Sequence, residues 1–276
     1  MDTAYQGVVM ETISITLGRD IQELELMPVS DTHIGDRRAD EELLRKRIAW
    51  IAEKPNRYTI LNGDLLNNAV RQGVSDVYGE RLSPMEAVKL TCEIFGPVKD
   101  RILAITDGNH EERTYKQDGI QLGHFVASEL GIADRYCAEG AVVFLRFGEY
   151  HGKSRQRESN GSGEMRRICY TIYATHGDGG GRKEGAKVIR LADLASIVDT
   201  DIYLHGHTHL PVIMKQGFNR VDVRNNAVAR VEKLFVNTGA YLNYGGYAER
   251  KGYKPPSLAS PIIYLSGTVK RMEAKL

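Results

Sequence analysis

Hydrophobic positions recur with two different periods along the first half of the chain. A period of two predicts a strand with one buried face, and a period near 3.6 predicts an amphipathic helix. On this basis the predicted strands are 13–17, 24–30, 58–61 and 101–106, and the predicted helices are 41–53, 83–95 and 118–130. Ser83, Pro84 and Glu86 strengthen the second helix, because they supply an N-cap, a first-turn proline and a capping box. Strands and helices therefore alternate as far as residue 130.

The second half of the chain is richer in strands. Predicted strands cover 141–147, 168–175 and 202–204, and an amphipathic helix covers 186–198. Hairpins follow from Val212 onward, with turns predicted at Asn225–Asn226 and Ser266–Gly267. An alternating half followed by a strand-rich half predicts an α/β fold, in which two sheets pack face to face with helices outside.

The chain shows no internal repeat and no linker, so we expect a single domain over residues 1–276. A polar and basic segment at 152–167 lies between two predicted strands, and we expect a mobile loop there. Such segments are usually solvated surface, and contact with a substrate is the rarer alternative.

Charge and composition narrow the classes of function. Lys and Arg (37) nearly balance Asp and Glu (36), and the pI is about 7.7. A protein that holds long nucleic acid mainly through phosphates carries a basic excess, so any nucleic-acid role here must rest on a local patch. No apolar run approaches the roughly 20 residues that span a bilayer, and the N-terminus lacks a signal-peptide core. We therefore expect a cytoplasmic protein with no membrane partner.

Five short motifs lie directly after predicted strands, and they are rich in side chains that bind metal ions. They are Asp31-Thr32-His33, Gly63-Asp64, Gly108-Asn109-His110-Glu111, His176-Gly177-Asp178 and Gly206-His207-Thr208-His209. In layered α/β proteins, ligands collect at the carboxyl ends of the strands. We therefore expect the five segments to converge on one site. The alternative is a set of turn-forming Asp and Asn residues with incidental histidines.

The donor atoms of these motifs are imidazole nitrogens and carboxylate or amide oxygens. The three cysteines form no CxxC pair, so neither a thiolate zinc site nor a disulfide framework is indicated. A donor set without thiolates suits manganese, iron, zinc, nickel or magnesium. Two ions about 3.5–4 Å apart can clamp both ends of a displacement at phosphorus, and a carboxylate can bridge them. We expect two divalent metal ions, with manganese favoured.

The order D-x-H, GD, GNHE, H and GHTH over residues 31–209 resembles the calcineurin-like metallophosphoesterase family. The resemblance implies a four-layer α/β/β/α sandwich of two mixed sheets flanked by helices. It also implies the ligands of two metal ions: Asp31, His33, Asp64 and His209 for the first, and Asp64, Asn109, His176 and His207 for the second, with Asp64 bridging. His110 would face the phosphate as an acid catalyst or a charge stabiliser.

Differences within the family narrow the reaction. Protein serine/threonine phosphatases of this superfamily carry a longer second motif, GDxVDRG, where this chain has Gly63-Asp64-Leu65-Leu66-Asn67. The closing GHTH resembles the phosphodiesterase and repair-nuclease branches, but the chain is short for the capping region of double-strand-break repair nucleases. The resemblance therefore favours a phosphodiesterase that acts on a nucleotide or nucleic-acid phosphodiester. A phosphomonoesterase and a non-catalytic scaffold on the same fold are the alternatives.

A tyrosine-rich segment at 241–253 (YLNYGGYAERKGY) offers a surface for the substrate. It brings Tyr244, Tyr247 and Arg250 close together in sequence. Aromatic faces beside guanidinium groups can stack a nucleobase and bind its phosphate. Packing of these tyrosines on the sheet edge is an alternative of equal weight. The sequence leaves the physiological substrate, the native metal and the oligomeric state open.

Overall fold

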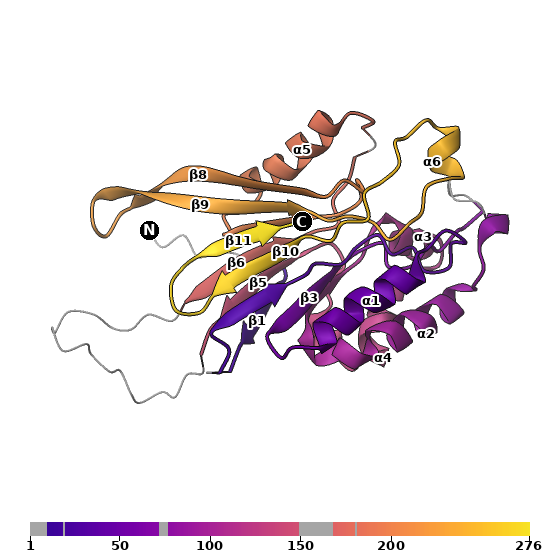
Figure 1. The fold of residues 1–276 in the computed structure, drawn as a ribbon, viewed down its shortest axis with the longest axis horizontal. Helices are drawn as coiled ribbons and strands as arrows, with labels where there is room; N and C mark the ends of the chain where they lie inside the picture. Colours follow the sequence, from indigo (N-terminus) through magenta and orange to yellow (C-terminus); the bar gives the residue numbers. More distant parts are fainter. Residues whose placement is uncertain (1–9, 19, 72–76, 149–167, 180) are drawn as a thin grey trace.

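The computed structural model describes residues 10–18, 20–71, 77–148, 168–179 and 181–276, with the side chain of Tyr247 left out. The predicted mobile loop at 152–167 lies outside these residues. Within them, two sheets lie against each other and helices cover the outer faces (Figure 1). The expected four-layer α/β/β/α sandwich of two mixed sheets is therefore confirmed.

One sheet has five strands in the order β11-β10-β2-β3-β4. Their bounds are β2 Glu23–Leu26, β3 Arg57–Asn62, β4 Ile102–Thr106, β10 Ile262–Ser266 and β11 Met272–Lys275. β2, β3 and β4 are parallel, whereas β10 is antiparallel to both of its neighbours. The three parallel strands therefore end at one edge, and the motifs at 31, 64 and 109 follow them there.

The other sheet has six strands in the order β1-β5-β6-β7-β9-β8. Their bounds are β1 Thr12–Thr16, β5 Ala141–Arg146, β6 Cys169–Ala174, β7 Ile202–His205, β8 Val212–Asp222 and β9 Ala227–Asn237. β6, β7 and β9 are parallel to one another. β8 and β9 form a long antiparallel hairpin (Figure 1), and the turn predicted at Asn225–Asn226 joins them.

Helices cover both outer faces of the sandwich. Their bounds are α1 Glu41–Ala52, α2 Pro84–Phe95, α3 Asn109–Asp118, α4 Leu122–Glu129, α5 Glu184–Asp193 and α6 Tyr247–Arg250. α1, α2 and α4 pack on the five-stranded sheet, and α5 packs on the six-stranded sheet (Figure 1). The capping box predicted at Ser83 and Glu86 is present at the start of α2. No helix within the described residues is long and apolar enough to cross a membrane.

The helix predicted at 118–130 is wrong in its first turn. Gly119, with a φ of 70°, ends α3 at Asp118, and α4 begins only at Leu122. Helix α3 itself was not predicted, because its sequence NHEERTYKQD has no apolar stripe and buries only the side chain of Glu111. Other bounds also differ from those expected. β2 ends at Leu26 rather than at residue 30, and α5 starts at 184 and ends at 193.

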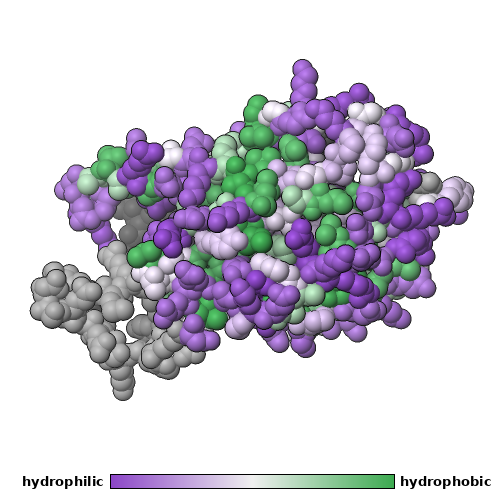
Figure 2. Space-filling model, viewed as in Figure 1, coloured by the Kyte–Doolittle hydropathy of each residue, from purple (hydrophilic) through white to green (hydrophobic). Residues whose placement is uncertain are grey.

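Apolar side chains form three layers of core. Ile60 and Leu204 pack between the two sheets. Their sequence neighbours Leu61 and Tyr203 point the other way and pack beneath the helices, because successive strand residues face opposite sides of a sheet. On the face shown in Figure 2, hydrophilic side chains predominate and hydrophobic ones gather in the middle. Each fully buried Leu or Ile contributes about 1.5–3 kcal/mol, so the layers hold the strand ends in place.

Candidate metal centre

All seven candidate ligands lie just beyond the carboxyl ends of strands. In the five-stranded sheet they follow β2 (Asp31 and His33), β3 (Asp64) and β4 (Asn109). In the six-stranded sheet they follow β6 (His176) and β7 (His207 and His209). The site therefore lies where the two sheets meet at their carboxyl edges. Neither sheet supplies the whole ligand set.

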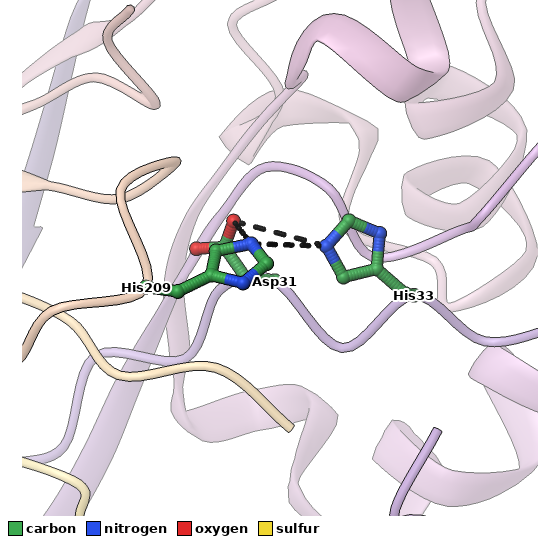
Figure 3. A group of neighbouring side chains, drawn as sticks. All are labelled: Asp31, His33 and His209. Carbon is green, nitrogen blue, oxygen red and sulfur yellow. Dashed lines mark hydrogen bonds and ion pairs between the residues drawn. The ribbon is translucent and has the colours of Figure 1, made fainter. Parts of the chain in front are cut away.

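Asp31, His33 and His209 form one cluster of converging side chains (Figure 3). Nε2 of His209 is 3.1 Å from Oδ1 of Asp31, and Nε2 of His33 is 4.0 Å from the same oxygen. The two Nε2 atoms are 3.3 Å apart. All three residues point donor atoms at one small volume, as the ligands of a single ion do.

Asp64, His176 and His207 form a second cluster, and their donor atoms lie within 4.8 Å of one another. Nε2 of His176 is 3.2 Å from Oδ2 of Asp64. Oδ1 of Asn109 is 2.8 Å from Nδ1 of His207, so the amide joins this cluster. The backbone N–H of His207 donates to Oδ2 of Asp31 at 3.1 Å, which ties the second cluster to the first.

His110 lies between the clusters. Its Nε2 is 3.7 Å from Oδ2 of Asp64, and its ring packs edge-on against His33 with centroids 4.5 Å apart. Asp64, His33 and His110 are also close enough together to hold an ion. Asp64 therefore belongs to groups on both sides of the centre, which is the position expected of a bridging carboxylate.

Five of the seven candidate ligands have a left-handed backbone. Their φ angles are 52° for Asp31, 45° for His33, 50° for Asp64, 60° for His207 and 53° for His209. A non-glycine residue in this region costs of order 1–3 kcal/mol, and such residues concentrate at functional sites. The sharp backbone turns let two residues of one short segment aim at the same volume.

Gly63 makes the close packing of the centre possible. It has a φ of 80°, and a Cβ at this position would lie 2.7 Å from both the backbone nitrogen of Gly108 and the ring of His176. A side chain would therefore separate the Asp64 segment from the Asn109 and His176 segments. This requirement explains why glycine precedes the central aspartate.

Two buried polar atoms of the centre have only another candidate ligand beside them: Asp31 Oδ1 lies 3.1 Å from His209 Nε2, and His176 Nε2 lies 3.2 Å from Asp64 Oδ2. Buried His33 Nδ1 has no hydrogen-bond partner among the described residues. A buried polar atom left without a partner costs about 1–3 kcal/mol, and more if it is charged. Asp31 Oδ1 and His176 Nε2 face the candidate ion positions, where a cation would satisfy them. The nitrogen and oxygen donors and the acidic charge also fit divalent ions, so the residues present fit a binuclear metal centre.

The charged groups of the centre control one another's ionisation. Burial alone would lower the pKa of His176, but the carboxylates of Asp64 and Asp31 outweigh it and raise that pKa to about 10. Burial would raise the pKa of Asp64, but His176 and His110 hold it well below its usual value. Burial, with the facing His110, lowers the pKa of His33. A metal ion would replace the proton on His176.

Glu111 supports the loops of the candidate ligands, and the sequence reasoning assigned it no role. Its buried carboxylate accepts hydrogen bonds from the backbone N–H groups of Asp64 (2.9 Å), Leu66 (2.8 Å) and Gly108 (2.8 Å). Burial and the charge of Asp64 raise the pKa of Glu111 to about 8. The carboxylate thus holds two ligand-bearing loops together. The available signal was its spacing of three from Gly108, because that spacing closes a capping box at the start of a helix.

The tyrosine-rich segment begins at the metal centre. The backbone N–H of Tyr241 donates to the carbonyl of Asp31 at 3.0 Å. Tyr244 is 42% exposed, and its hydroxyl donates to the carbonyl of Tyr253 at 2.9 Å. Arg250 is exposed in α6. The predicted side-chain contribution of Tyr247 lies outside the described residues.

Contacts of Tyr253 and of the next residue, Lys254, join this segment to the loop that follows His176 and to the start of α5. Lys254 forms an ion pair with Glu184, and the guanidinium of Arg182 lies 5.9 Å from the ring centroid of Tyr253. The segment therefore reaches from the Asp31 side of the centre to the His176 side.

A cavity of about 640 Å³ opens beside the second cluster, with Asn109 and His176 in its wall. Five carboxylates line it, from Asp107, Glu112, Glu139, Asp178 and Asp193. Arg190 also lines it, and this guanidinium is 3.2 Å from the carboxylate of Asp178. The cavity is therefore acidic on balance among the described residues.

Comparison with known proteins gives a family match and several structural likenesses. The model of the calcineurin-like phosphoesterase family matches residues 26–211, which include all seven candidate ligands. No curated protein sequence matches the chain.

Three solved structures illustrate the structural likenesses. A predicted phosphoesterase from Streptococcus pneumoniae is 12% identical and has a TM-score of 0.33, over 92% of this chain and 98% of that one. Vps29 of Entamoeba histolytica, complexed with Zn²⁺, is 13% identical with a TM-score of 0.37, over 91% and 97%. GAP50 of Plasmodium is 10% identical with a TM-score of 0.43, over 88% and 81%.

Proposed function

The chain belongs to the calcineurin-like phosphoesterase family, and we propose that it is a binuclear metal-dependent phosphodiesterase acting on a nucleotide or nucleic-acid phosphodiester. The observation that supports this most directly is the pair of neighbouring Asp–His clusters, in which Asp64 belongs to the second cluster and also lies close to His33 of the first. Each cluster offers one ion a set of nitrogen and oxygen donors, and none of the candidate ligands has been replaced by a side chain that cannot bind a metal.

In this proposal Asp31, His33, Asp64 and His209 hold one ion, and Asp64, Asn109, His176 and His207 hold the other. Two divalent ions, when bound, acidify the attacking water and neutralise charge on the phosphate oxygens. Manganese is our first candidate, with iron, zinc, nickel and magnesium as alternatives. The protein holds the donor atoms in fixed positions. It does so through the left-handed turns that follow the strands and through the hydrogen bonds of Glu111.

We propose that His110 donates a proton to the leaving group. Its Nε2 lies 3.7 Å from Oδ2 of Asp64 between the two clusters, so a phosphate held by both ions would lie within reach of this nitrogen. A positioned acid of this kind contributes roughly 10²–10⁴-fold to the rate. The same nitrogen, if it stays protonated, stabilises charge on the non-bridging oxygens, and the choice between the two roles can be measured.

Preference for a diester rests on the space around the centre. A phosphodiester carries two substituents. The acidic cavity opens beside Asn109 and His176, and the tyrosine-rich segment contacts Asp31 through the backbone of Tyr241. Five carboxylates disfavour a second phosphate in the cavity, so we place an uncharged substituent there. The substituent with a base or a second phosphate would then meet Tyr244, Tyr247 and Arg250.

A paired assay tests the function. The metal-loaded protein should hydrolyse bis(4-nitrophenyl) phosphate faster than 4-nitrophenyl phosphate, and it should cleave at least one member of a panel of cyclic nucleotides, single-stranded DNA and RNA. Faster hydrolysis of the monoester would identify a phosphomonoesterase instead. Absence of hydrolysis with two ions bound would indicate a scaffold.

A further inference from the structure

Glu80 joins two of the loops that surround the metal centre. It lies just after the 3₁₀ turn Val77–Gly79, and its Oε2 accepts hydrogen bonds from the side-chain amide of Asn67 and from the backbone N–H of Ala69, both at 2.8 Å. Both donors belong to the loop that follows Asp64. The carboxylate of Glu80 therefore fixes this loop at Asn67 and Ala69.

The backbone carbonyl of Asn67 is in turn a hydrogen-bond partner of His110. Nδ1 of His110 is 2.5 Å from this oxygen, and Nη1 of Arg113 donates to the same oxygen at 3.2 Å. The side-chain amide of Asn68 donates to the carbonyl of His110 at 2.7 Å. The loop after Asp64 thus holds both the backbone and the ring of His110.

The hydrogen bond between Nδ1 of His110 and the carbonyl of Asn67 decides which ring nitrogen carries the proton of the neutral ring. A carbonyl oxygen only accepts hydrogen bonds, so Nδ1 must be the donor and the neutral ring must be the Nδ1–H tautomer. Any further proton can then enter or leave only at Nε2, the nitrogen that faces Asp64. A ring with mixed tautomers would present Nε2 as a usable acceptor for only part of the time.

We propose that Glu80 is a positioning residue for the reaction: by holding Asn67, it fixes His110 in the Nδ1–H tautomer with Nε2 facing the phosphate. The inference rests on the proposed function for its rate effect, but the tautomer itself can be observed without turnover. It assigns a role to a carboxylate that no metal-ligand motif includes and that lies 13 residues beyond Asn67 in the chain.

A purely structural role for Glu80 must be separated from this one. The carboxylate also lies against Gly35, in the loop that carries His33, and the backbone N–H of the next residue, Arg81, donates to the carbonyl of Gly35. Loss of Glu80 could therefore loosen a metal-binding loop. Such loosening would lower metal content and would slow all substrates equally.

Two substitutions of equal length separate the roles. Glu80→Gln keeps an oxygen where Oε2 now accepts both hydrogen bonds, whereas Glu80→Met removes every acceptor at nearly the same volume. The ¹⁵N shifts of the His110 ring, measured in the metal-free protein at a pH where the ring is neutral, report the tautomer. Turnover is compared on an alkyl diester, whose leaving group needs a proton, and on a nitrophenyl diester, whose leaving group does not.

We expect wild type and Glu80→Gln to show the Nδ1–H tautomer and similar rates on both esters. In Glu80→Met the proton should be shared between the two nitrogens, and the rate on the alkyl ester should fall roughly tenfold more than the rate on the nitrophenyl ester. A single Nδ1–H tautomer in Glu80→Met, an equal loss on both esters, or an equal loss in both variants overturns the proposal. If wild type cleaves neither ester, the proposed function fails, and the ring shifts still decide the tautomer.

Discussion

His33, which is buried, and His209, which is partly exposed, lie at a distance that requires a cation or a proton between them. Nε2 of His33 and Nε2 of His209 are 3.3 Å apart, and both face the carboxylate of Asp31. Two lone pairs directed at each other repel, so at least one nitrogen must carry a hydrogen or bind a cation. The candidate ligands therefore depend on one another. For each substitution, metal content should be measured as well as turnover.

Asp64→Asn should be the most damaging change of a single ligand. Asp64 belongs to groups on both sides of the centre, so loss of its charge weakens both ion positions. Even residues that only support ligands change metal affinity about 10–100-fold, and a shared ligand should do at least as much. Elemental analysis should find fewer than two ions, and turnover should fall by at least roughly 100-fold. Asp134→Asn, an exposed change far from the centre, is the control, and two retained ions in Asp64→Asn would rule out bridging.

His110→Ala tests the acid catalyst. Turnover on an alkyl diester should fall roughly 10²–10⁴-fold, because the leaving oxygen loses its proton donor. The loss should be smaller on a nitrophenyl diester, and metal content should stay at two ions. If both esters lose activity equally, His110 stabilises charge on the phosphate. If an ion is lost, His110 is a ligand, as its proximity to His33 and Asp64 would allow.

At the scale of elements, short turns rather than the strands themselves aim the functional side chains. Asp31, His33, Asp64, His207 and His209 each adopt a left-handed backbone just beyond a strand. The tyrosine-rich segment is another such connector, because it pairs with the Asp31 segment through Tyr241. Substrate specificity usually resides in connecting segments of this kind, which a rigid scaffold of strands and helices positions.

Tyr244→Ala tests whether the tyrosine-rich segment binds the substrate. If the ring stacks on a nucleobase, its loss removes about 1–3 kcal/mol of binding and weakens a nucleotide diester roughly ten- to a hundredfold. Hydrolysis of a small nitrophenyl diester should be nearly unaffected, since this substrate has no base to stack on the tyrosine-rich segment. Tyr244→Phe is the matched control, because it keeps the ring and loses only the hydroxyl bond to Tyr253. Equal effects of Tyr244→Ala on both substrates would exclude base stacking.

At the scale of the whole molecule, the metal centre connects the two sheets. Asp31, Asp64 and Asn109 come from the five-stranded side, whereas His176 and His207 come from the six-stranded side. Elsewhere the sheets are held together by the apolar layer between them. Ions bound at the seam therefore add a link between the two halves at the end where the loops are polar.

Chelation should lower the melting temperature of the protein. Ligand at about 100 times its dissociation constant stabilises a fold by about 2.7 kcal/mol. In a chain of this size, 1 kcal/mol shifts the midpoint by about 2–4 °C, so we expect a fall of about 5–10 °C. Thermal unfolding with and without chelator measures it, and Asp64→Asn should respond less. An unchanged midpoint after complete removal of metal would contradict a structural contribution of the ions.

The gain in stability from metal should increase with pH. In the metal-free protein the pKa of His176 is raised to about 10, because Asp64 and Asp31 outweigh the effect of burial. A raised histidine pKa contributes stability that is complete below about pH 6.5 and is lost as the pH rises through about 10. Metal ions require the neutral ring and replace the lost proton. Melting curves with and without metal between about pH 6.5 and 10 should diverge, and a constant difference would refute this account.

The sequence by itself determined the types of most elements and the identity of the candidate ligands. Apolar periodicity located β3 and α1, because burial of one face leaves a local repeat. Helix α3 escaped this reasoning, since it exposes almost all of its side chains and has no repeat to detect. The motifs identified Asp64 and His176 because metal ligands are confined to a few residue types.

Only the tertiary structure decided how these residues act together. The seven candidate ligands come from segments up to 178 residues apart, and their convergence follows from two sheets that end at a common seam. Glu111 and Glu80 are ordinary acidic residues in sequence, and only the fold brings their carboxylates to the backbone of Asp64 and the side chain of Asn67. Such contacts join distant segments and leave no local period, because a hydrogen bond depends on where two atoms meet and not on how far apart they are in the chain.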